Sequence, residues 1–210
     1  MTAPGRFISL EGMDGCGKST QARLLAEALR ARGREVVLTR EPGGSAGAED
    51  IRRLLVEGDP NRWSPEAEIL LFTAARRDHL ERLIAPALER GAIVVTDRFA
   101  DSTRVYQGAA RADLREVVDA LHGLMIGREP DRTLVLDMAP EDALARGLAR
   151  NSGEDRFEDM GLAFQERLRA GFQALVKAAP ERCRLIAAKG AEAAVAARVL
   201  AAVEDMIDGG

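Results

Sequence analysis

The sequence predicts an α/β fold in which helices flank a parallel sheet of about five strands. Short apolar runs of strand type alternate along the chain with longer segments in which apolar residues recur every three or four positions. Strands and helices that alternate in this way form parallel sheets with helices on both faces. The 210 residues are 46% hydrophobic and 30% charged, which is the composition of a globular chain with a sizeable core.

Five runs are predicted to form the strands: Phe7 to Glu11, Glu35 to Thr39, Ala92 to Asp97, Arg132 to Asp137 and Arg182 to Ala187. Gly33 follows the first helical segment, as a glycine at a helix C-terminus commonly does. Ser64 and Pro65 are typical of an N-cap and a first helical position. Pro86 is expected to break or kink the segment from Pro65 to Arg90, because proline lacks the N–H of a helix interior.

The length predicts one domain spanning residues 1–210, with a short mobile lid at about 146–158, where the chain is polar and contains Gly153. The longest apolar runs fall far short of the ~20 residues of a membrane span. The N-terminus has no apolar stretch of a secretory signal, and Cys16 and Cys183 have no metal-type spacing. We therefore expect a reducing, cytoplasmic location.

The charged and titratable residues exclude several classes of protein. A net charge of −4 argues against nucleic acid as the main partner, although a local basic cleft for a small anion is compatible with it. The only histidines are His79 and His122, and both lie in helical stretches, where we expect structural roles. A histidine metal site and a Ser–His–Asp triad are therefore not expected.

The segment from Gly12 to Ser19 matches the P-loop pattern G-x-x-x-x-G-K-[ST], with an apolar strand before it and an amphipathic helix after it. Its glycines allow backbone N–H groups to approach phosphate oxygens, and the positive end of the following helix points at the same place. Lys18 is expected to contact the β- and γ-phosphates, and the Ser19 hydroxyl can ligate Mg²⁺. The pattern G-x-G-x-x-G is not satisfied, because Thr20 occupies the third glycine position. The predicted ATP-binding residues are Gly12, Met13, Asp14, Gly15, Cys16, Gly17, Lys18, Ser19 and Thr20.

Arginines follow two of the predicted strands, Arg40 after the second and Arg98 after the third. Ligands of open α/β sheets bind at the carboxyl ends of the strands, so both side chains are expected on the P-loop side. Guanidinium groups there can hold a second phosphate and screen its repulsion from the first. The guanine-reading Asn-Lys-x-Asp segment of GTPases is absent. The pattern favours a kinase that acts on a small phosphorylated acceptor.

Several segments in this order make the chain similar to the bacterial thymidylate kinase family along nearly its full length: Glu11 to Thr20, Thr39 to Gly44, Leu71 to Arg76, Asp97-Arg98, Asp101 to Gly108 and Pro130-Asp131. The resemblance implies that MgATP and thymidine monophosphate are converted to ADP and thymidine diphosphate. Two alternatives remain open at this point. One is a different pyrimidine monophosphate as the acceptor, and the other is a P-loop switch or ATPase that hydrolyses ATP without an acceptor.

The resemblance also implies roles for individual residues. It places Asp14 near the deoxyribose 3′-hydroxyl and the cluster of Arg40, Arg52 and Arg98 around the acceptor phosphate. For the base, it places Phe72 against the thymine ring and Arg76 at its edge. Thr103 and Gln107 are expected as further base contacts. Phe72 and Arg76 are four positions apart and therefore share one face of a helix. An aromatic face beside a planar donor suits a pyrimidine.

The residues expected to act in phosphoryl transfer are Lys18, Asp97, Arg98, Arg150 and Arg156, with Ser19 and Asp97 as the Mg²⁺ residues. Gly15 stands where some relatives place an arginine, so the lid segment is expected to supply that charge from Arg146, Arg150 or Arg156. Asp97 could hold Mg²⁺ through water or orient the acceptor phosphate, and Glu41 is expected near the metal. The resemblance further implies a homodimer through helices near Ser64 to Arg90 and Leu114 to Ile126.

Overall fold

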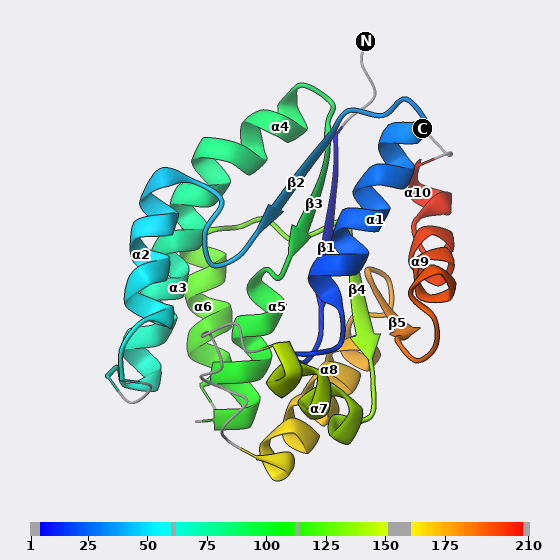
Figure 1. Cartoon of the computed structure of the whole chain (residues 1–210). Coiled ribbons are helices and arrows are strands. Elements are labelled where there is room, and N and C mark those ends of the chain that lie inside the picture. Colours follow the sequence, from blue (N-terminus) through cyan, green and yellow to red (C-terminus); the bar gives the residue numbers. More distant parts are fainter. Residues whose placement is uncertain (1–4, 60–61, 112–113, 151–160, 208–210) are drawn as a thin grey trace.

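A computed structural model describes residues 5–59, 62–111, 114–150 and 161–207. Its five strands form one parallel sheet in the order β2-β3-β1-β4-β5 (Figure 1). The strands are β1 (Arg6–Glu11), β2 (Val36–Arg40), β3 (Ile93–Asp97), β4 (Arg132–Asp137) and β5 (Cys183–Ala187). The predicted α/β fold is confirmed, and every strand boundary lies within one residue of its expected position.

Helices connect the strands and cover the sheet: α1 (Lys18–Ala31), α2 (Ala46–Val56), α3 (Pro65–His79), α4 (Ala85–Glu89), α5 (Ala100–Thr103), α6 (Arg115–Met125), α7 (Pro140–Arg150), α8 (Leu162–Ala178), α9 (Glu192–Ala201) and α10 (Glu204–Ile207). Two π-helical segments, η1 (Leu80–Ile84) and η2 (Arg104–Arg111), continue α3 and α5. Among the described helices, none is long and apolar enough to cross a membrane.

The N-terminus of α3 forms as its residue types predict. The Ser64 hydroxyl accepts a hydrogen bond from the Ala67 N–H at 3.2 Å, and Pro65 takes the first helical position. The predicted break at Pro86 is a change of hydrogen-bond register. The π segment η1 precedes it, and Pro86 lies in the first turn of α4, where a missing N–H costs little.

Alternating side chains of the central strands build the core on both faces of the sheet. Ile8 and Val95 are register partners and belong to the cluster that contains Leu25 of α1. Their neighbours Phe7 and Val94 are also partners, and both belong to the separate cluster with Leu80 and Ile84. This period of two is the consequence of strand geometry, and it gives the three-layer arrangement.

The order of the strands positions the site. The chain passes from β3, on one side of β1, to β4, on the other side. In parallel sheets such a reversal leaves a crevice at the carboxyl ends of the strands, where ligands bind. The P-loop follows β1 directly, so it lies at this crevice (Figure 1).

Candidate nucleotide-binding site

The P-loop turns tightly because three glycines adopt positive φ angles: Gly12 at 137°, Gly15 at 79° and Gly17 at 94°. Gly15 also lies directly against α7. A Cβ atom there would be 2.0 Å from the Ala143 carbonyl oxygen, so no larger residue fits without moving the helix. The close approach of the P-loop to α7 is therefore possible only with glycine at this position.

The N-terminus of α1 suits an anion. The N-cap residue of this 14-residue helix is Gly17, which has no side-chain oxygen, and no side chain of the described residues caps the first N–H groups, which point toward the loop. The Lys18 ammonium is buried beneath them. It donates a hydrogen bond to the Met13 carbonyl at 2.7 Å and lies 3.7 Å from the Asp14 carboxylate. The loop therefore combines backbone donors with a fixed positive charge, which is the arrangement that binds phosphates.

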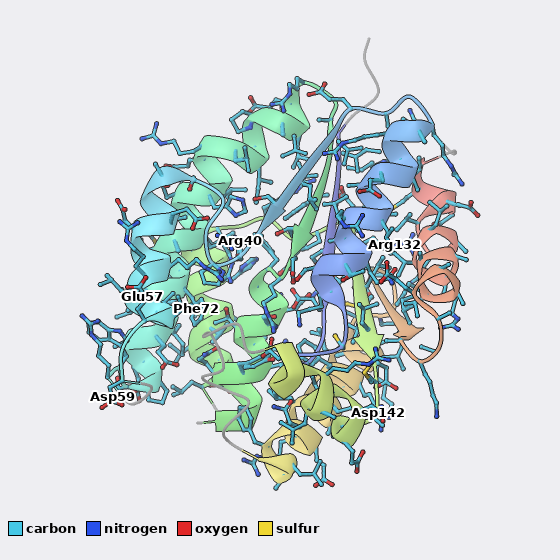
Figure 2. All side chains as sticks on the ribbon, in the orientation of Figure 1. Arg40, Glu57, Asp59, Phe72, Arg132 and Asp142 are labelled. Atoms are coloured by element: carbon cyan, nitrogen blue, oxygen red, sulfur yellow. The ribbon has the colours of Figure 1, made fainter. Side chains whose placement is uncertain are left out.

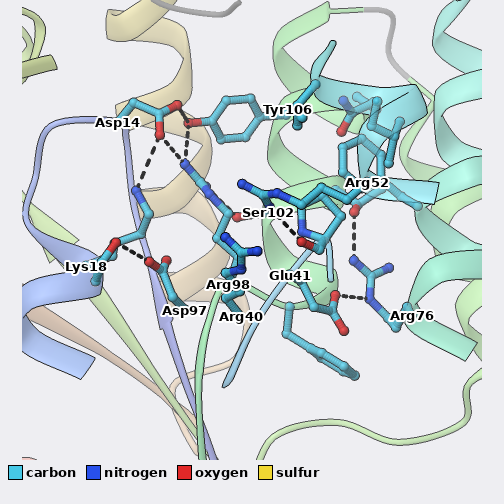
Figure 3. A pocket seen from close by; sticks show the side chains of 18 of the residues that line it. Asp14, Lys18, Arg40, Glu41, Arg52, Arg76, Asp97, Arg98, Ser102 and Tyr106 are labelled. Atoms are coloured by element: carbon cyan, nitrogen blue, oxygen red, sulfur yellow. Dashed lines mark hydrogen bonds and ion pairs between the residues drawn. The ribbon is translucent and has the colours of Figure 1, made fainter. Parts of the chain in front are cut away.

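Arg98, Asp14 and Tyr106 form a hydrogen-bonded cluster beside the P-loop (Figure 3). Arg98 donates to the Asp14 carboxylate at 2.6 Å, and the Tyr106 hydroxyl donates to its other oxygen at 2.9 Å. Burial opposes ionisation of Asp14, but the charges of Arg98 and Lys18 and the bond from Tyr106 outweigh it and lower the pKa of the carboxyl. Asp14 is therefore an ionised anchor that orients Arg98.

The backbone also holds Arg98 in place. Its φ of 71° is the one positive value among the described non-glycine residues, and such a conformation persists only where neighbours enforce it. Its N–H donates to the Leu10 carbonyl at 2.9 Å, and its own carbonyl accepts from the Thr96 hydroxyl at 2.9 Å. The guanidinium also donates to the Ser102 hydroxyl at 2.7 Å. The arginine is thus preorganised at the end of β3.

Glu11 is fully buried below this cluster. Its carboxyl oxygens accept from the Phe99 N–H at 2.7 Å and from the Ser102 hydroxyl at 2.5 Å. Burial and the nearby negative charge of Asp101 raise the pKa of Glu11 to about 8. Glu11 therefore links the end of β1 to the segment that carries Arg98.

Ser19 and Asp97 meet next to the P-loop. The Ser19 hydroxyl donates to Asp97 Oδ2 at 2.5 Å, whereas the buried Oδ1 has no hydrogen-bond partner within the described part of the chain. The described residues contain no group of three or more histidine, cysteine or acidic side chains that could hold a metal by themselves. Mg²⁺ rarely uses such cages and is usually held by one or two protein groups, phosphates and water. The Ser19–Asp97 pair suits this type of site.

The residues predicted to bind the acceptor come together in one cavity of about 270 Å³, which Figure 3 shows from close by. Its walls include Asp14, Lys18, Ser19, Arg40, Arg52, Phe72, Arg76, Asp97, Arg98, Thr103 and Gln107. Figure 2 shows Arg40 at the end of β2 and Phe72 on α3, and both line this cavity. The P-loop, the ends of β2 and β3, and the helical segments α1, α2, α3, α5 and η2 thus meet in one place.

Arg76 is held at one end of the cavity by a buried ion pair. Its Nε donates to Glu41 Oε2 at 2.7 Å, and its Nη2 donates to the Thr103 hydroxyl at 3.0 Å. The other oxygen of Glu41 lies 3.1 Å from His79 Nδ1, and His79 Nε2 lies 2.8 Å from the Thr39 hydroxyl. Both oxygens of Glu41 therefore have partners, and Glu41 orients Arg76. It lines the same cavity as Ser19 and Asp97, and its expected place near the metal stays a prediction.

Arg40 and Arg52 line the same cavity with part of their side chains in contact with other residues. Arg40 pairs with Glu49 at 3.0 Å, and Arg52 donates to the Pro42 carbonyl at 2.6 Å. The Gly44 N–H and Arg40 both donate to Glu49, which lowers the pKa of its carboxyl. Together with Arg98, these side chains make this part of the cavity attractive to an anion.

A second cavity, of about 520 Å³, lies on the other side of the P-loop. It is lined by Gly15, Cys16, Gly17, Thr20, Gln21, Arg146, Ala188, Gly190 and Glu192. Gly15 and Gly17 line both cavities, so the P-loop separates them. Gly12 and Met13 line neither, and their carbonyls accept from Arg98 and Lys18. Arg146 of α7 reaches the second cavity, whereas Arg156 and the side chain of Arg150 lie outside the described residues.

Sequence reasoning missed several lining residues: Pro42, Leu55, Val56, Phe99, Ser102 and Tyr106. Ser102 and Tyr106 lie in the segment Asp101 to Gly108, which was recognised for its similarity but given no role at these two positions. Their spacing of four on a helical segment was the available signal, because it places both hydroxyls on one face.

The parallel sheet and the P-loop at the carboxyl end of β1 define an α/β P-loop nucleotide-binding protein. The family model for thymidylate kinase matches residues 10–199. The thymidylate kinase of Dinoroseobacter shibae is 72% identical over 201 residues, covering 96% of this chain and 97% of that protein, and that of a Jannaschia species is 67% identical, covering 92% and 93%. The crystal structure of thymidylate kinase from Ehrlichia chaffeensis superposes with a TM-score of 0.78 at 35% identity, over 96% of this chain and 99% of that one. The chain belongs to the thymidylate kinase family, which consists of ATP-dependent nucleotide kinases.

Proposed function

We propose that this chain transfers the γ-phosphoryl group of MgATP to thymidine monophosphate, with the acceptor in the first cavity and ATP in the second. The observation that carries the proposal is that Gly15 and Gly17 line both cavities. Two nucleotides bound in this way would bring their phosphates together at the P-loop. Phosphoryl transfer depends mainly on such positioning and on fixed positive charge.

In the proposed complex, the first cavity divides between the two ends of the acceptor. Arg40, Arg52 and Arg98 hold its phosphate, and Asp14 faces the deoxyribose. Phe72, Arg76, Thr103 and Gln107 contact the base, with the ring of Phe72 as the apolar surface. Lys18 and Arg98 stabilise the negative charge on the oxygens of the moving phosphoryl group.

Mg²⁺ would be held by the Ser19 hydroxyl and, directly or through water, by Asp97. The unpartnered buried oxygen of Asp97 and its contact with Ser19 support this assignment. Bound there, Mg²⁺ would neutralise charge on the β- and γ-phosphate oxygens. Because Ser19 and Asp97 already touch, no rearrangement of the backbone is needed to bring the two groups together.

The segment 146–158 is proposed as a lid on a single domain, with Arg146, Arg150 and Arg156 as sources of charge for the ATP phosphates. The close packing of Gly15 against Ala143 supports this, because it fixes α7 to the P-loop at the start of the segment. Arg150→Ala and Arg156→Ala are each expected to lower turnover while leaving the melting temperature unchanged. Full turnover in both single variants would contradict the lid assignment.

A homodimer through α3 and α6 is also proposed. These neighbouring helices carry exposed apolar side chains, with Leu70 58% exposed and Leu124 81% exposed. Arg77 of α3 donates to the Met125 carbonyl at 2.7 Å and links the ends of the two helices. An exposed apolar face of this kind suits a second copy of the chain. A cytoplasmic location is proposed from the free, buried thiols of Cys16 and Cys183.

A panel of nucleoside monophosphates tests the proposed function. The chain is incubated with MgATP and each of the thymidine, uridine, cytidine and adenosine monophosphates, and the products are separated by chromatography. We expect thymidine diphosphate to form fastest, in amounts that equal the ADP released. ADP release without any nucleoside diphosphate, or preference for uridine or cytidine monophosphate, would overturn the proposal.

A further inference from the structure

Two buried carboxylates hold side chains in the part of the first cavity proposed to contact the base, and Glu41 also lines the cavity itself. Glu41 follows β2 and is 6% exposed, and Glu68 on α3 is 0% exposed. Each accepts a hydrogen bond from a lining residue. Glu41 accepts from Arg76 at 2.7 Å, and Glu68 Oε2 accepts from Gln107 Nε2 at 3.2 Å. Buried carboxylates are costly unless they are hydrogen-bonded, so both contacts hold the lining side chains firmly.

The contact with Glu68 determines which way the Gln107 amide faces. A glutamine amide has a donor end and an acceptor end, and the two can exchange by a half-turn. The amide nitrogen donates to Glu68 Oε2, so the NH₂ faces Glu68 and the carbonyl lies on the other side of the group. Gln107 is 1% exposed and lines the cavity, so it has little freedom to adopt another orientation.

Arg76 has the opposite polarity. A guanidinium group carries donors only, and Glu41 and Thr103 fix its orientation from two sides. The wall of the cavity therefore combines a donor at Arg76 with an acceptor at Gln107. A pyrimidine with a 4-keto group and a proton on N3 matches this pattern. Cytosine does not, because it has an amino group at C4 and an acceptor at N3.

We propose that Glu68 is a positioning residue that sets base specificity: it holds the amide nitrogen of Gln107 so that the carbonyl faces the base and accepts the N3 proton. The inference rests on the proposed function, because it requires the acceptor base in the first cavity. A site built to pair with one group rejects an analogue that leaves its polar atoms unpaired. Glu68 would thereby favour 4-keto pyrimidines without touching them.

The test is Glu68→Gln, which keeps the shape of the side chain and can donate to the Gln107 carbonyl. Gln107 can then turn its NH₂ toward the base. We expect the ratio of kcat/KM for thymidine monophosphate to that for cytidine monophosphate to fall about tenfold. The ratio for thymidine over deoxyuridine monophosphate should stay unchanged, because those bases share the same edge. Glu66→Gln, an exposed position on the same helix, is the matched control and should alter neither ratio.

A purely structural role for Glu68 would lower activity on all three nucleotides by the same factor, and that result would overturn the proposal. If Glu68→Gln does not fold, the amide is observed in the unaltered chain by NMR with ¹⁵N-labelled glutamine. The Gln107 NH₂ signals, assigned by their loss in Gln107→Met, should exchange slowly and shift little when thymidine monophosphate binds. Large shifts of both protons would show the NH₂ facing the base and would overturn the proposal.

Failure of the proposed function and failure of the role of Glu68 give different results. If the unaltered chain does not phosphorylate thymidine monophosphate, the proposed function is wrong. If the unaltered chain is active and selective but Glu68→Gln keeps the thymidine-to-cytidine ratio of the unaltered chain, only the role of Glu68 is wrong.

Discussion

Replacement of Gly15 by alanine is expected to abolish most of the activity through a single methyl group. The new Cβ would lie 2.0 Å from the Ala143 carbonyl oxygen, where ordinary contacts begin at 3.4 Å. The P-loop and α7 must therefore separate by about 1.4 Å. Displacements of about 1 Å in a site that works by positioning cost about 100-fold in rate. We expect kcat/KM for both substrates to fall by about that factor or more.

The strain of the altered residue can be separated from the clash. Gly15 has a φ of 79°, and alanine in this conformation costs ~1–2 kcal/mol, which lowers the melting temperature by a few degrees. Gly33 has a nearly identical φ of 77°, but a Cβ there would meet nothing within 4 Å. Gly33→Ala should therefore lower the melting temperature by the few degrees that the positive φ costs alanine. Its turnover in a coupled assay of ADP release should stay unchanged. Turnover of Gly15→Ala within about threefold of the unaltered chain would mean that the contact between the P-loop and α7 does not position the phosphates, because loss of positioning should cost far more.

Three other variants test separate parts of the structure. Asp14→Asn removes the ionised partner of Arg98. We therefore expect kcat/KM for thymidine monophosphate to fall about 10- to 100-fold while KM for ATP changes little. An unchanged kcat/KM would contradict the anchoring role of Asp14. Burial raises the pKa of Glu11 from 4.5 to about 8, so between these values the folded chain keeps a proton that the unfolded chain has lost. The free energy of unfolding, measured with urea, should therefore fall as pH rises from 5 to 8. In Glu11→Gln this fall should be smaller, because the titrating carboxyl is gone. An equal fall in both proteins would exclude the raised pKa of Glu11. Leu124→Glu should dissociate the proposed dimer in sedimentation experiments. Leu185→Glu, at another exposed apolar position, is the control and should leave the dimer intact. A dimer that persists in both variants would place the interface elsewhere.

The fold was predictable because its signals are local. Short apolar runs of strand type indicated the five strands, and the longer segments between them indicated helices. The P-loop was recognisable from glycine spacing between a strand and a helix. The order of the strands then places Arg40 and Arg98 beside it, as the carboxyl-end rule predicts.

The partners of the site residues were not predictable, because they depend on contacts between distant segments. Arg98 was expected to face a phosphate, but neither its positive φ nor its contact with Asp14, 84 positions earlier, has a local signature. Glu41 was expected near the metal, and its pairing with Arg76 and His79 depends on how α3 packs beside β2. Glu68 appears in the sequence as an ordinary helical acid, and only its full burial reveals a role.

In the proposed complex, two nucleotides bind at once on opposite sides of the P-loop. Calorimetric titration of thymidine monophosphate into the chain saturated with Mg²⁺ and a non-hydrolysable ATP analogue measures this simultaneous binding. We expect one molecule of thymidine monophosphate to bind per chain, with an affinity that the analogue does not abolish. Mutual displacement of the two nucleotides would mean that they share one site and would rule out simultaneous binding.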